Sequence, residues 1–439
     1  MITLSHFQAR RQKVFEQMTD NSMAVLFAAP MQYRNSDTEQ PYRQDSHFYY
    51  LTGFDESAAI AVLLKKGAQC RFILFCQDKD PTAEMWTGSR VGVNGAKEYG
   101  ADLAYPIGET PKRFPELLLD IENLYYLVNA APHLDQKLFS WLKNVPKKSR
   151  SSSNTPHKFI DLSAILNEMR LIKSTEEITL MRRAAEISVS AHIAAMQNCK
   201  PGMNEYNLEA ILLHEFYRMG SRHVAYSSIV AAGNNACTLH YTRNQDLLKD
   251  KQLVLIDAGA EFENYAADIT RTFPINGKFT SDQQAIYELV LASQTAAIDL
   301  VAPGVKWEEI QQKIIQVLVA GLIDLKILKG NLQDLIDQKA YEPFYMHNSG
   351  HWLGMDVHDV GDYKVKGQSR PLVPGMVFTI EPGLYFAENN AHVPEKWRGI
   401  GVRIEDDILT TSTGKEVLTN HAPKKVNAIE ELMRKGNIS

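Results

Sequence analysis

Short apolar runs alternate with amphipathic or polar segments over the first 170 residues. The runs MAVLFAA, AIAVLLKK, RFILFC and NLYYLVN have the length of buried strands, and FQARRQKVFEQM has the spacing of a helix that covers a sheet. The polar, serine-rich stretch PKKSRSSSNTPHK, which begins at Pro146, is the best candidate for a linker or an exposed loop. The pattern predicts an N-terminal α/β domain over residues 1–170, with the boundary near Arg170.

Long amphipathic helices dominate the remaining part of the chain, residues 171–439. A capping box from Ser174 to Glu177 precedes the helical pattern ITLMRRAAEISVSAHIAAM, and Asn204 and Gly220 have the residue types that begin and end the next helix. A second pair of helices is predicted from SDQQAIYELVLASQTAAIDLV and WEEIQQKIIQVLVAGLIDL. The second domain is therefore predicted to be built on two helix pairs.

Each predicted helix pair is followed by a strand that ends on a carboxylate and a glycine. These strands are LVLIDAGAEF, with Asp257, and MVFTIEPGLYF, with Glu381. A further β-rich run follows each of them and carries a second acid, Asp268 in AADITRTF and Glu405 in GVRIEDDIL. We interpret the pattern as a weak duplication of a helix-helix-strand-strand unit, and a pseudo-twofold arrangement would bring the four carboxylates together.

Composition and charge narrow the classes of function. The chain has 439 residues, 44% hydrophobic and 23% charged, with a formal net charge of -5, which argues against nucleic acid as a partner because phosphate binding requires a basic face. The N-terminus lacks the features of a secretory signal, and no apolar run is long enough for a transmembrane helix, so no membrane partner is expected. Four scattered cysteines favour reduced thiols and a cytoplasmic protein.

Four carboxylates on neighbouring strands repel one another, and burial without counter-charge would force protonation. One such acid could be a solvated residue at a strand end, but all four stand in apolar strand sequences. Bound cations would remove the free-energy cost of burying these four negative charges together. The acids together with one imidazole would form a mainly oxygen ligand set for two divalent metal ions about 3.5 to 4 Å apart. Manganese is the first choice for such ligands, while cobalt, iron and zinc remain open.

The segment HNSGHWLGMDVHDV places three histidines close together, at positions 347, 351 and 358. Taken singly, each is more often structural than catalytic. His351 is the best ligand candidate, because the strand or loop entry at HWLG is followed by a predicted close backbone approach at Gly354. His347, His358 and His240, in ACTLHYTRN, are left to contact the substrate or the metal ligands. Two bound cations would activate a water molecule between them and polarise a carbonyl, so metal-assisted hydrolysis of an amide is the natural reaction class. A Ser or Cys nucleophile is not required, and the chain has no GxSxG motif.

Six stretches together carry a family resemblance. They are FYYLTGFDE, GNNACTLHYT, IDAGAEFENYAADITRTFPINGKF, MHNSGHWLGMDVHDVG, GMVFTIEPGLYF and RGIGVRIEDDIL. In these residues the chain resembles the bacterial Xaa-Pro aminopeptidase family, or aminopeptidase P, of the pita-bread metallopeptidases, over nearly its whole length. The resemblance implies an α/β (α+β) protein in which a pita-bread catalytic domain, the duplicated ααββ unit, follows the N-terminal α/β domain.

The resemblance also implies a role for each acid and histidine. Asp257 would hold one metal ion, Asp268 and Glu405 would bridge both, and His351 with Glu381 would complete the other. A hydroxide that bridges the two ions would attack the peptide carbonyl, and Glu381 matches the general base of the family. The remaining matched positions are His240 and His358, which contact the reacting peptide and the proline ring, and His347 and Arg403, which support the pocket.

The implied substrate is a peptide with a free N-terminal residue followed by proline. That bond is a tertiary amide without an N–H, which ordinary extended-chain peptidases fit poorly. Tyr385 and Trp86 match aromatic pocket positions of the family, although aromatic residues are more often core. Residues 1–170 would contribute to the substrate pocket and to the contacts of a homodimer or homotetramer. The chain departs from the family at Asn348–Ser349, where a Gly-Leu pair is common, and in the insert-like AENNAHVPEKWRG.

Other readings of the sequence stay open. Prolidase, the Xaa-Pro dipeptidase, shares the fold, the metal ligands and the histidine motifs, and differs in substrate length. Methionine aminopeptidases share the metal site but usually lack a large N-terminal domain. A non-catalytic pita-bread binding protein would be expected to have lost ligands, whereas all five positions here are able to bind a metal.

Overall fold

The computed structural model describes residues 2–128, 130–145, 155–391 and 393–436. It divides into two compact units, residues 1–169 and residues 170–439. The predicted linker at Pro146 falls largely on residues 146–154, which lie outside the described residues; its last residue, Lys158, begins a strand.

The first unit is built on one mixed sheet of six strands, in the order β6-β5-β4-β1-β7-β8. Strand β1 pairs antiparallel with β4 and parallel with β7. The sheet strands are β1 (Ser22–Phe27), β4 (Ile60–Lys66), β5 (Gln69–Cys76), β6 (Leu103–Pro106), β7 (Asn123–Tyr126) and β8 (Lys158–Asp161). A separate hairpin joins β2 (Tyr33–Asn35) to β3 (Thr38–Glu39).

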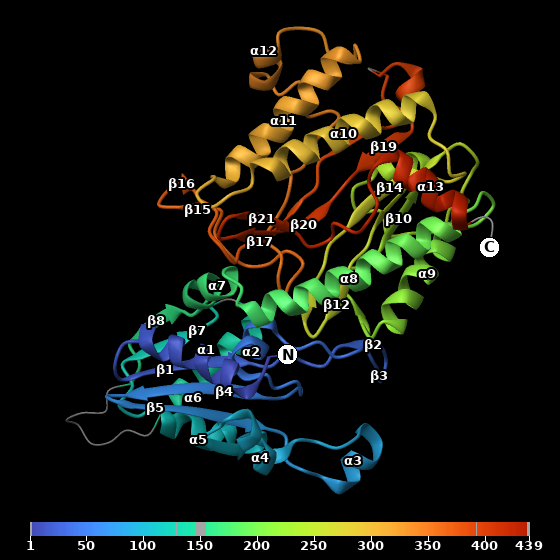
Figure 1. Ribbon diagram of the computed structural model, residues 1–439. Helices are drawn as coiled ribbons and strands as arrows, with labels where there is room; N and C mark the ends of the chain where they lie inside the picture. Colours follow the sequence, from blue (N-terminus) through green and yellow to red (C-terminus); the bar gives the residue numbers. More distant parts are fainter. Residues whose placement is uncertain (1, 129, 146–154, 392, 437–439) are drawn as a thin grey trace. The chain divides into compact units, whose positions relative to one another are not determined.

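Helices cover both faces of this sheet (Figure 1). The helices of this unit are α1 (Leu4–Gln17), α2 (Ser46–Thr52), α3 (Pro81–Thr87), α4 (Gly92–Gly95), α5 (Thr110–Leu117), α6 (Pro132–Lys143) and α7 (Ser163–Leu171), which ends just beyond the unit; α3 lies apart from the sheet. Met23 and Val25 point to the face where they pack with Phe114 of α5 and Trp141 of α6. The alternation of side chains along a strand turns Ala24 and Leu26 towards the other face, which is why the apolar runs are continuous.

Two helix pairs form the outer layer of the second unit (Figure 1). The four helices are α8 (Thr175–Asn198), α9 (Glu205–Arg218), α10 (Ser281–Leu300) and α11 (Trp307–Asp324), and two shorter helices are α12 (Leu332–Asp337) and α13 (Val426–Gly436). The predicted capping box is confirmed, because Ser174 N donates to Glu177 at 2.9 Å and Glu177 N to the Ser174 hydroxyl at 3.4 Å.

The strands of the second unit occur in two corresponding sets. One sheet has the order β10-β11-β14 and the other β17-β20-β21, each preceded in the chain by a helix pair. The first half contains β9 (His223–Val224), β10 (Ile229–Ala232), β11 (Leu253–Asp257), β12 (Ala260–Phe262), β13 (Tyr265–Ala266) and β14 (Thr270–Pro274). The second contains β15 (Lys364–Val365), β16 (Gln368–Ser369), β17 (Val377–Ile380), β18 (Gly383–Phe386), β19 (Ile400–Arg403), β20 (Asp406–Thr411) and β21 (Gly414–Val417). This repeat is the duplication that the sequence predicts.

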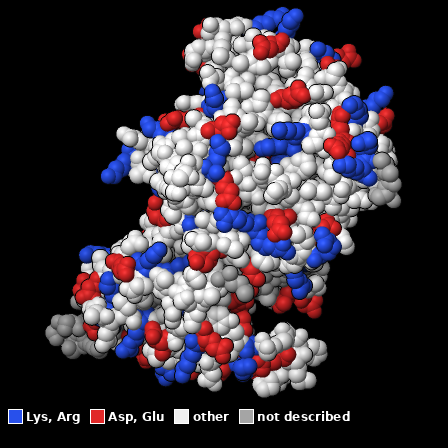
Figure 2. Space-filling model, viewed as in Figure 1, with Lys and Arg blue, Asp and Glu red and all other residues white. Residues whose placement is uncertain are grey.

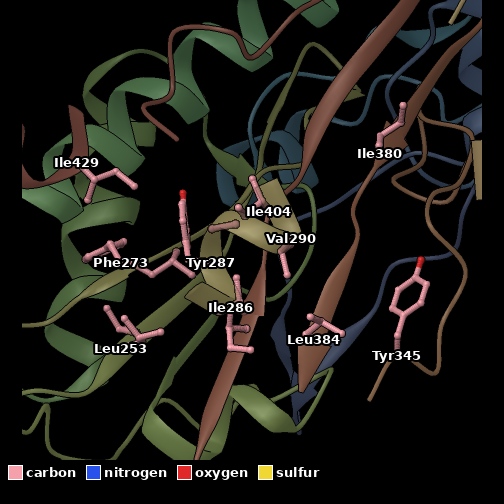
Figure 3. Close-up of a cluster of buried hydrophobic side chains, with 14 of the residues drawn as sticks. Leu253, Phe273, Ile286, Tyr287, Val290, Tyr345, Ile380, Leu384, Ile404 and Ile429 are labelled. Atoms are coloured by element: carbon pink, nitrogen blue, oxygen red, sulfur yellow. The ribbon is translucent and has the colours of Figure 1, made fainter. Parts of the chain in front are cut away.

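One hydrophobic core joins the two halves of the second unit. Figure 3 shows Leu253 and Phe273 from the first set of strands near Ile286, Tyr287 and Val290 of α10. Ile380, Leu384 and Ile404 of the second set belong to the same buried cluster. Because both halves share this core, the ends of their strands are held in a fixed arrangement.

The surface carries charges of both signs. On the face shown in Figure 2, basic and acidic side chains are interspersed. Within the described part of the chain, no helix combines the length and the apolar character that a membrane span requires.

Candidate metal centre

Four acids stand at the ends of strands from both halves of the second unit. Asp257 ends β11 and lies opposite Thr270 of β14, and Asp268 comes just before β14. Glu381 directly follows β17, and Glu405 directly precedes β20. All four line one cavity of about 770 Å³. The structure therefore brings together the four carboxylates that the sequence singles out.

His351 lies among these carboxylates. Its Nε2 is 3.4 Å from Oδ2 of Asp268 and 3.7 Å from Oε1 of Glu381. Asp268, His351 and Glu405 each offer a ligand atom within 4.8 Å of those of the other two. The His351 Nδ1–H donates to the Trp352 carbonyl at 3.1 Å, which leaves Nε2 free to bind a metal.

Burial and mutual repulsion raise the pKa of Glu381, Asp268 and Glu405. Burial, followed by the charge of Glu405, raises the pKa of Glu381 to about 8. Burial also raises the pKa of Asp268 and of Glu405 well above their ordinary values, and Asp257 adds to both effects. A divalent cation would remove this repulsion, and clustered carboxylate oxygens with one imidazole are ligands that such cations accept. The residues of the cavity thus fit a divalent metal centre.

The loop that carries His351 approaches another side chain at Gly354. A Cβ atom at Gly354 would lie 2.1 Å from Oδ2 of Asp359, so the predicted close approach is confirmed. Asp359 is buried and accepts hydrogen bonds from Arg170 and, at 3.0 Å, from Lys173. These ion pairs fasten the loop that presents His351 and His358.

Arg403 and His347 line the cavity, and Arg403 connects one acid to Tyr385, which lies behind the lining. Its guanidinium donates to Oδ2 of Asp257 at 2.6 Å and to the Tyr385 hydroxyl at 3.2 Å. The Tyr385 hydroxyl in turn donates to Nε2 of His347 at 2.9 Å, because His347 Nδ1–H donates to the Asn348 carbonyl. Burial, with Arg403 adding, lowers the pKa of His347 to about 4, so its imidazole is neutral.

The other two predicted histidines reach the cavity from separate loops. The His358 ring is 4.2 Å from the His351 ring, between centroids, and His358 is exposed to solvent. His240 follows the 3-10 helix Gly233–Cys237 and is also exposed. Both line the cavity with the four acids. Two imidazoles are therefore available to a molecule that enters.

The two predicted aromatic pocket residues have different surroundings. Tyr385 is 2% exposed and lies behind the lining, where it contacts His347 and Arg403. Trp86 belongs to α3 of the first unit, and its side chain is 86% exposed. The role of each in substrate binding stays a prediction.

Three polar residues that sequence reasoning missed hold the acids. The Tyr226 hydroxyl contacts both Asp257, at 2.6 Å, and Asp268. The Thr270 hydroxyl donates to Glu405 at 2.6 Å. The Thr379 hydroxyl contacts Glu381 at 3.4 Å and accepts from His351 N at 3.1 Å. Each threonine is two residues from an acid along an extended segment, so the period of a strand offered a signal; Tyr226 had none.

Both units of the chain match known protein families. The model of Metallopeptidase family M24 matches residues 179–412, and the model of the Aminopeptidase P N-terminal domain matches residues 7–125. The chain is 47% identical to the Xaa-Pro aminopeptidase of Escherichia coli (strain K12), over 98% of each protein. It is 37% identical to the human Xaa-Pro aminopeptidase 3, over 94% of this chain and 81% of the relative.

Solved structures agree over both units. The Pseudomonas aeruginosa aminopeptidase PepP superposes with a TM-score of 0.98 at 49% identity, over 100% of this chain and 99% of that one. E. coli aminopeptidase P with the inhibitor Pro-Leu gives a TM-score of 0.97 at 46% identity, over 100% of both chains. The predicted fold class, an N-terminal α/β domain followed by the pita-bread domain, is confirmed.

Proposed function

We propose, on the premise that this chain belongs to metallopeptidase family M24 and to its aminopeptidase P branch, that it removes the N-terminal residue from peptides with proline in the second position. The observation that carries the proposal is the convergence of three buried acids, the half-buried Glu381 and His351 in one cavity that also contains His240 and His358. The relatives named above as Xaa-Pro aminopeptidases support the choice of substrate.

The five side chains that are able to bind a metal are proposed to have different roles as ligands. Asp257 would hold one ion, and Asp268 and Glu405 would bridge both. His351 and Glu381 would complete the second site. Two divalent cations bound here would supply a hydroxide nucleophile near neutral pH and would polarise the carbonyl of the scissile bond. Manganese is proposed because oxygen atoms dominate the ligand set.

Glu381 is the proposed general base. Its carboxylate lies at the cavity surface, half-buried, and Thr379 contacts one oxygen at 3.4 Å. A carboxylate held in this way is positioned to take a proton from the nucleophile and to pass it to the proline nitrogen as the bond breaks. That nitrogen leaves as a secondary amine, which requires a proton.

The imidazoles are proposed to act on the peptide. His240 and His358 come from separate loops, and each would offer an N–H to the oxygen that gains negative charge in the transition state. Flat rings beside this position also suit the compact pyrrolidine ring. Arg403, with Tyr385 and His347 behind it, is proposed to hold Asp257 in place.

The proposal extends to three properties of the whole protein. Residues 1–170 are proposed to form a domain that contributes to the substrate pocket through Trp86, whose exposed indole suits such a contact. A cytoplasmic location and a homodimer or homotetramer complete the proposal. Sedimentation of the purified protein would measure the last of these.

Titration with manganese tests the metal centre. Metal-stripped protein is expected to bind two equivalents by calorimetry and to regain Xaa-Pro-peptide hydrolysis as the second equivalent binds. Full activity in the metal-stripped protein would exclude the proposed mechanism.

A further inference from the structure

Glu205, the first residue of α9, is a carboxylate buried outside the metal centre. Its exposed fraction is 0%. Oε1 accepts hydrogen bonds from Ala232 N at 2.8 Å and from Asn235 Nδ2 at 3.0 Å. Oε2 accepts from the Tyr241 hydroxyl at 2.9 Å and from Asp246 N at 2.8 Å. Four donors thus surround the two oxygens.

All four donors belong to one segment, residues 232–246, and His240 lies inside it. Tyr241, which directly follows His240, packs against the cluster formed by Ile229, Ala231, Ala236, Leu255 and Tyr385. The far end of the segment is fixed to β10, because Asn244 accepts from Val230 N at 2.9 Å and donates to Ser228 O at 2.8 Å. The exposed His240 is therefore presented from a segment that is held on both sides.

The buried carboxylate of Glu205 carries a free-energy cost that the fold has to compensate. Burying a carboxylate is costly unless every lone pair is satisfied, and an apolar side chain would avoid that cost. Here four donors and the N-terminal end of α9 compensate the charge. Hydrogen bonds to an ionised acceptor are about twice as strong as neutral ones, so the carboxylate holds the segment more firmly than a neutral residue would.

We propose that Glu205 is a positioning residue that fixes His240 in the cavity through the Tyr241 hydroxyl. The inference rests on the proposed function, in which His240 contacts the reacting peptide. Glu205 itself touches neither metal ligand nor substrate, and acts through the backbone and side chain next to His240.

Two variants test the inference at different strengths. Tyr241→Phe removes one hydroxyl and keeps the ring that packs on the core. Glu205→Gln keeps the shape but turns an amide N–H₂ towards the N–H of Asp246, which repels it. The matched control is Tyr206→Phe, because Tyr206 is the next residue on α9 and is 50% exposed. This control is expected to leave kcat, KM and Tm unchanged.

A double-mutant cycle with His240→Ala separates positioning from stability. On a Xaa-Pro tripeptide, Tyr241→Phe is expected to lower kcat by roughly threefold to tenfold when His240 is present, the loss of about one hydrogen bond. In the His240→Ala background it should have no further effect on kcat, while its effect on Tm should be equal in both backgrounds. Amide exchange in residues 238–246 should become faster in Glu205→Gln.

The outcomes are distinguishable. Unchanged kcat in Tyr241→Phe, or the same fold-loss with and without His240, would overturn the inference and leave the proposed function intact. Unchanged kcat in His240→Ala would instead refute the proposed role of His240, and the inference with it. If Glu205→Gln does not fold, Tyr241→Phe alone decides.

Discussion

The Thr270 hydroxyl donates a hydrogen bond of 2.6 Å to Glu405, and both side chains are almost fully buried. The same hydroxyl accepts from Nε of Arg403 at 3.1 Å. Thr270 lies two residues after Asp268, so one extended segment both presents an acid and orients the acid opposite. The metal centre is therefore held from behind by neutral hydroxyl groups.

Removing this hydroxyl should weaken metal binding without unfolding the protein. Thr270→Val keeps the shape of the side chain but leaves Glu405 without its donor, so we expect the Kd for manganese to rise by about 10- to 100-fold. Calorimetry would measure it. Thr410→Val is the control, because the buried Thr410 hydroxyl has no hydrogen-bond partner in the described part of the protein. An equal change in both variants would contradict the proposed role of Thr270.

Two other variants should distinguish a residue that binds metal from a residue that acts only on the substrate. Asp268→Asn should lose metal and activity together, because the carboxylate proposed to bridge the two ions becomes a neutral amide. His358→Ala should retain both metal ions and lose kcat by on the order of 10²-fold. Elemental analysis beside steady-state kinetics would test this. Full metal content in Asp268→Asn would show that the bridging assignment is wrong.

The ion pairs of Asp359 should make stability depend on pH. Burial raises the pKa of Asp359, but Lys173 and Arg170 outweigh burial and hold it below its ordinary value. A depressed pKa stabilises the fold above the unfolded pKa of about 3.9, and this contribution is lost as the pH falls through the lower folded value. Asp359→Asn should therefore cost about 3–5 kcal/mol near neutral pH.

The difference between wild type and Asp359→Asn should shrink when the pH falls below about 4. Chemical denaturation of the metal-free proteins across this range would measure it. Asp362→Asn, at an exposed position of the same loop, should behave as wild type at every pH. A difference that stays constant with pH would contradict the assignment.

The sequence predicted the parts of the site that stand out against their surroundings. Asp257, Asp268, Glu381 and Glu405 were conspicuous because each interrupts an apolar strand sequence, and helix ends such as Ser174 followed local capping rules. These are properties of a residue and its neighbours in the chain. The N-terminal α/β domain and the duplication in the second domain followed from the same local patterns, whereas the pita-bread fold was implied by the family resemblance.

Contacts between segments that are far apart in the chain could not be predicted from these local patterns. Tyr226 reaches Asp257 and Asp268, and Glu205 binds a segment that ends 41 residues later. Neither relationship has a spacing that can be read along the chain. Tyr385 illustrates the same limit, because the sequence marked an aromatic residue but not its position behind the cavity lining.

The most direct test of the proposed activity is a paired hydrolysis assay. Purified protein would be given a Xaa-Pro dipeptide and a Xaa-Pro-Xaa tripeptide, first with manganese and then with a chelator. We predict faster release of the N-terminal residue from the tripeptide, dependent on manganese and abolished by chelation. Cleavage of the dipeptide alone would indicate a prolidase, and cleavage of neither peptide would contradict the enzymatic account.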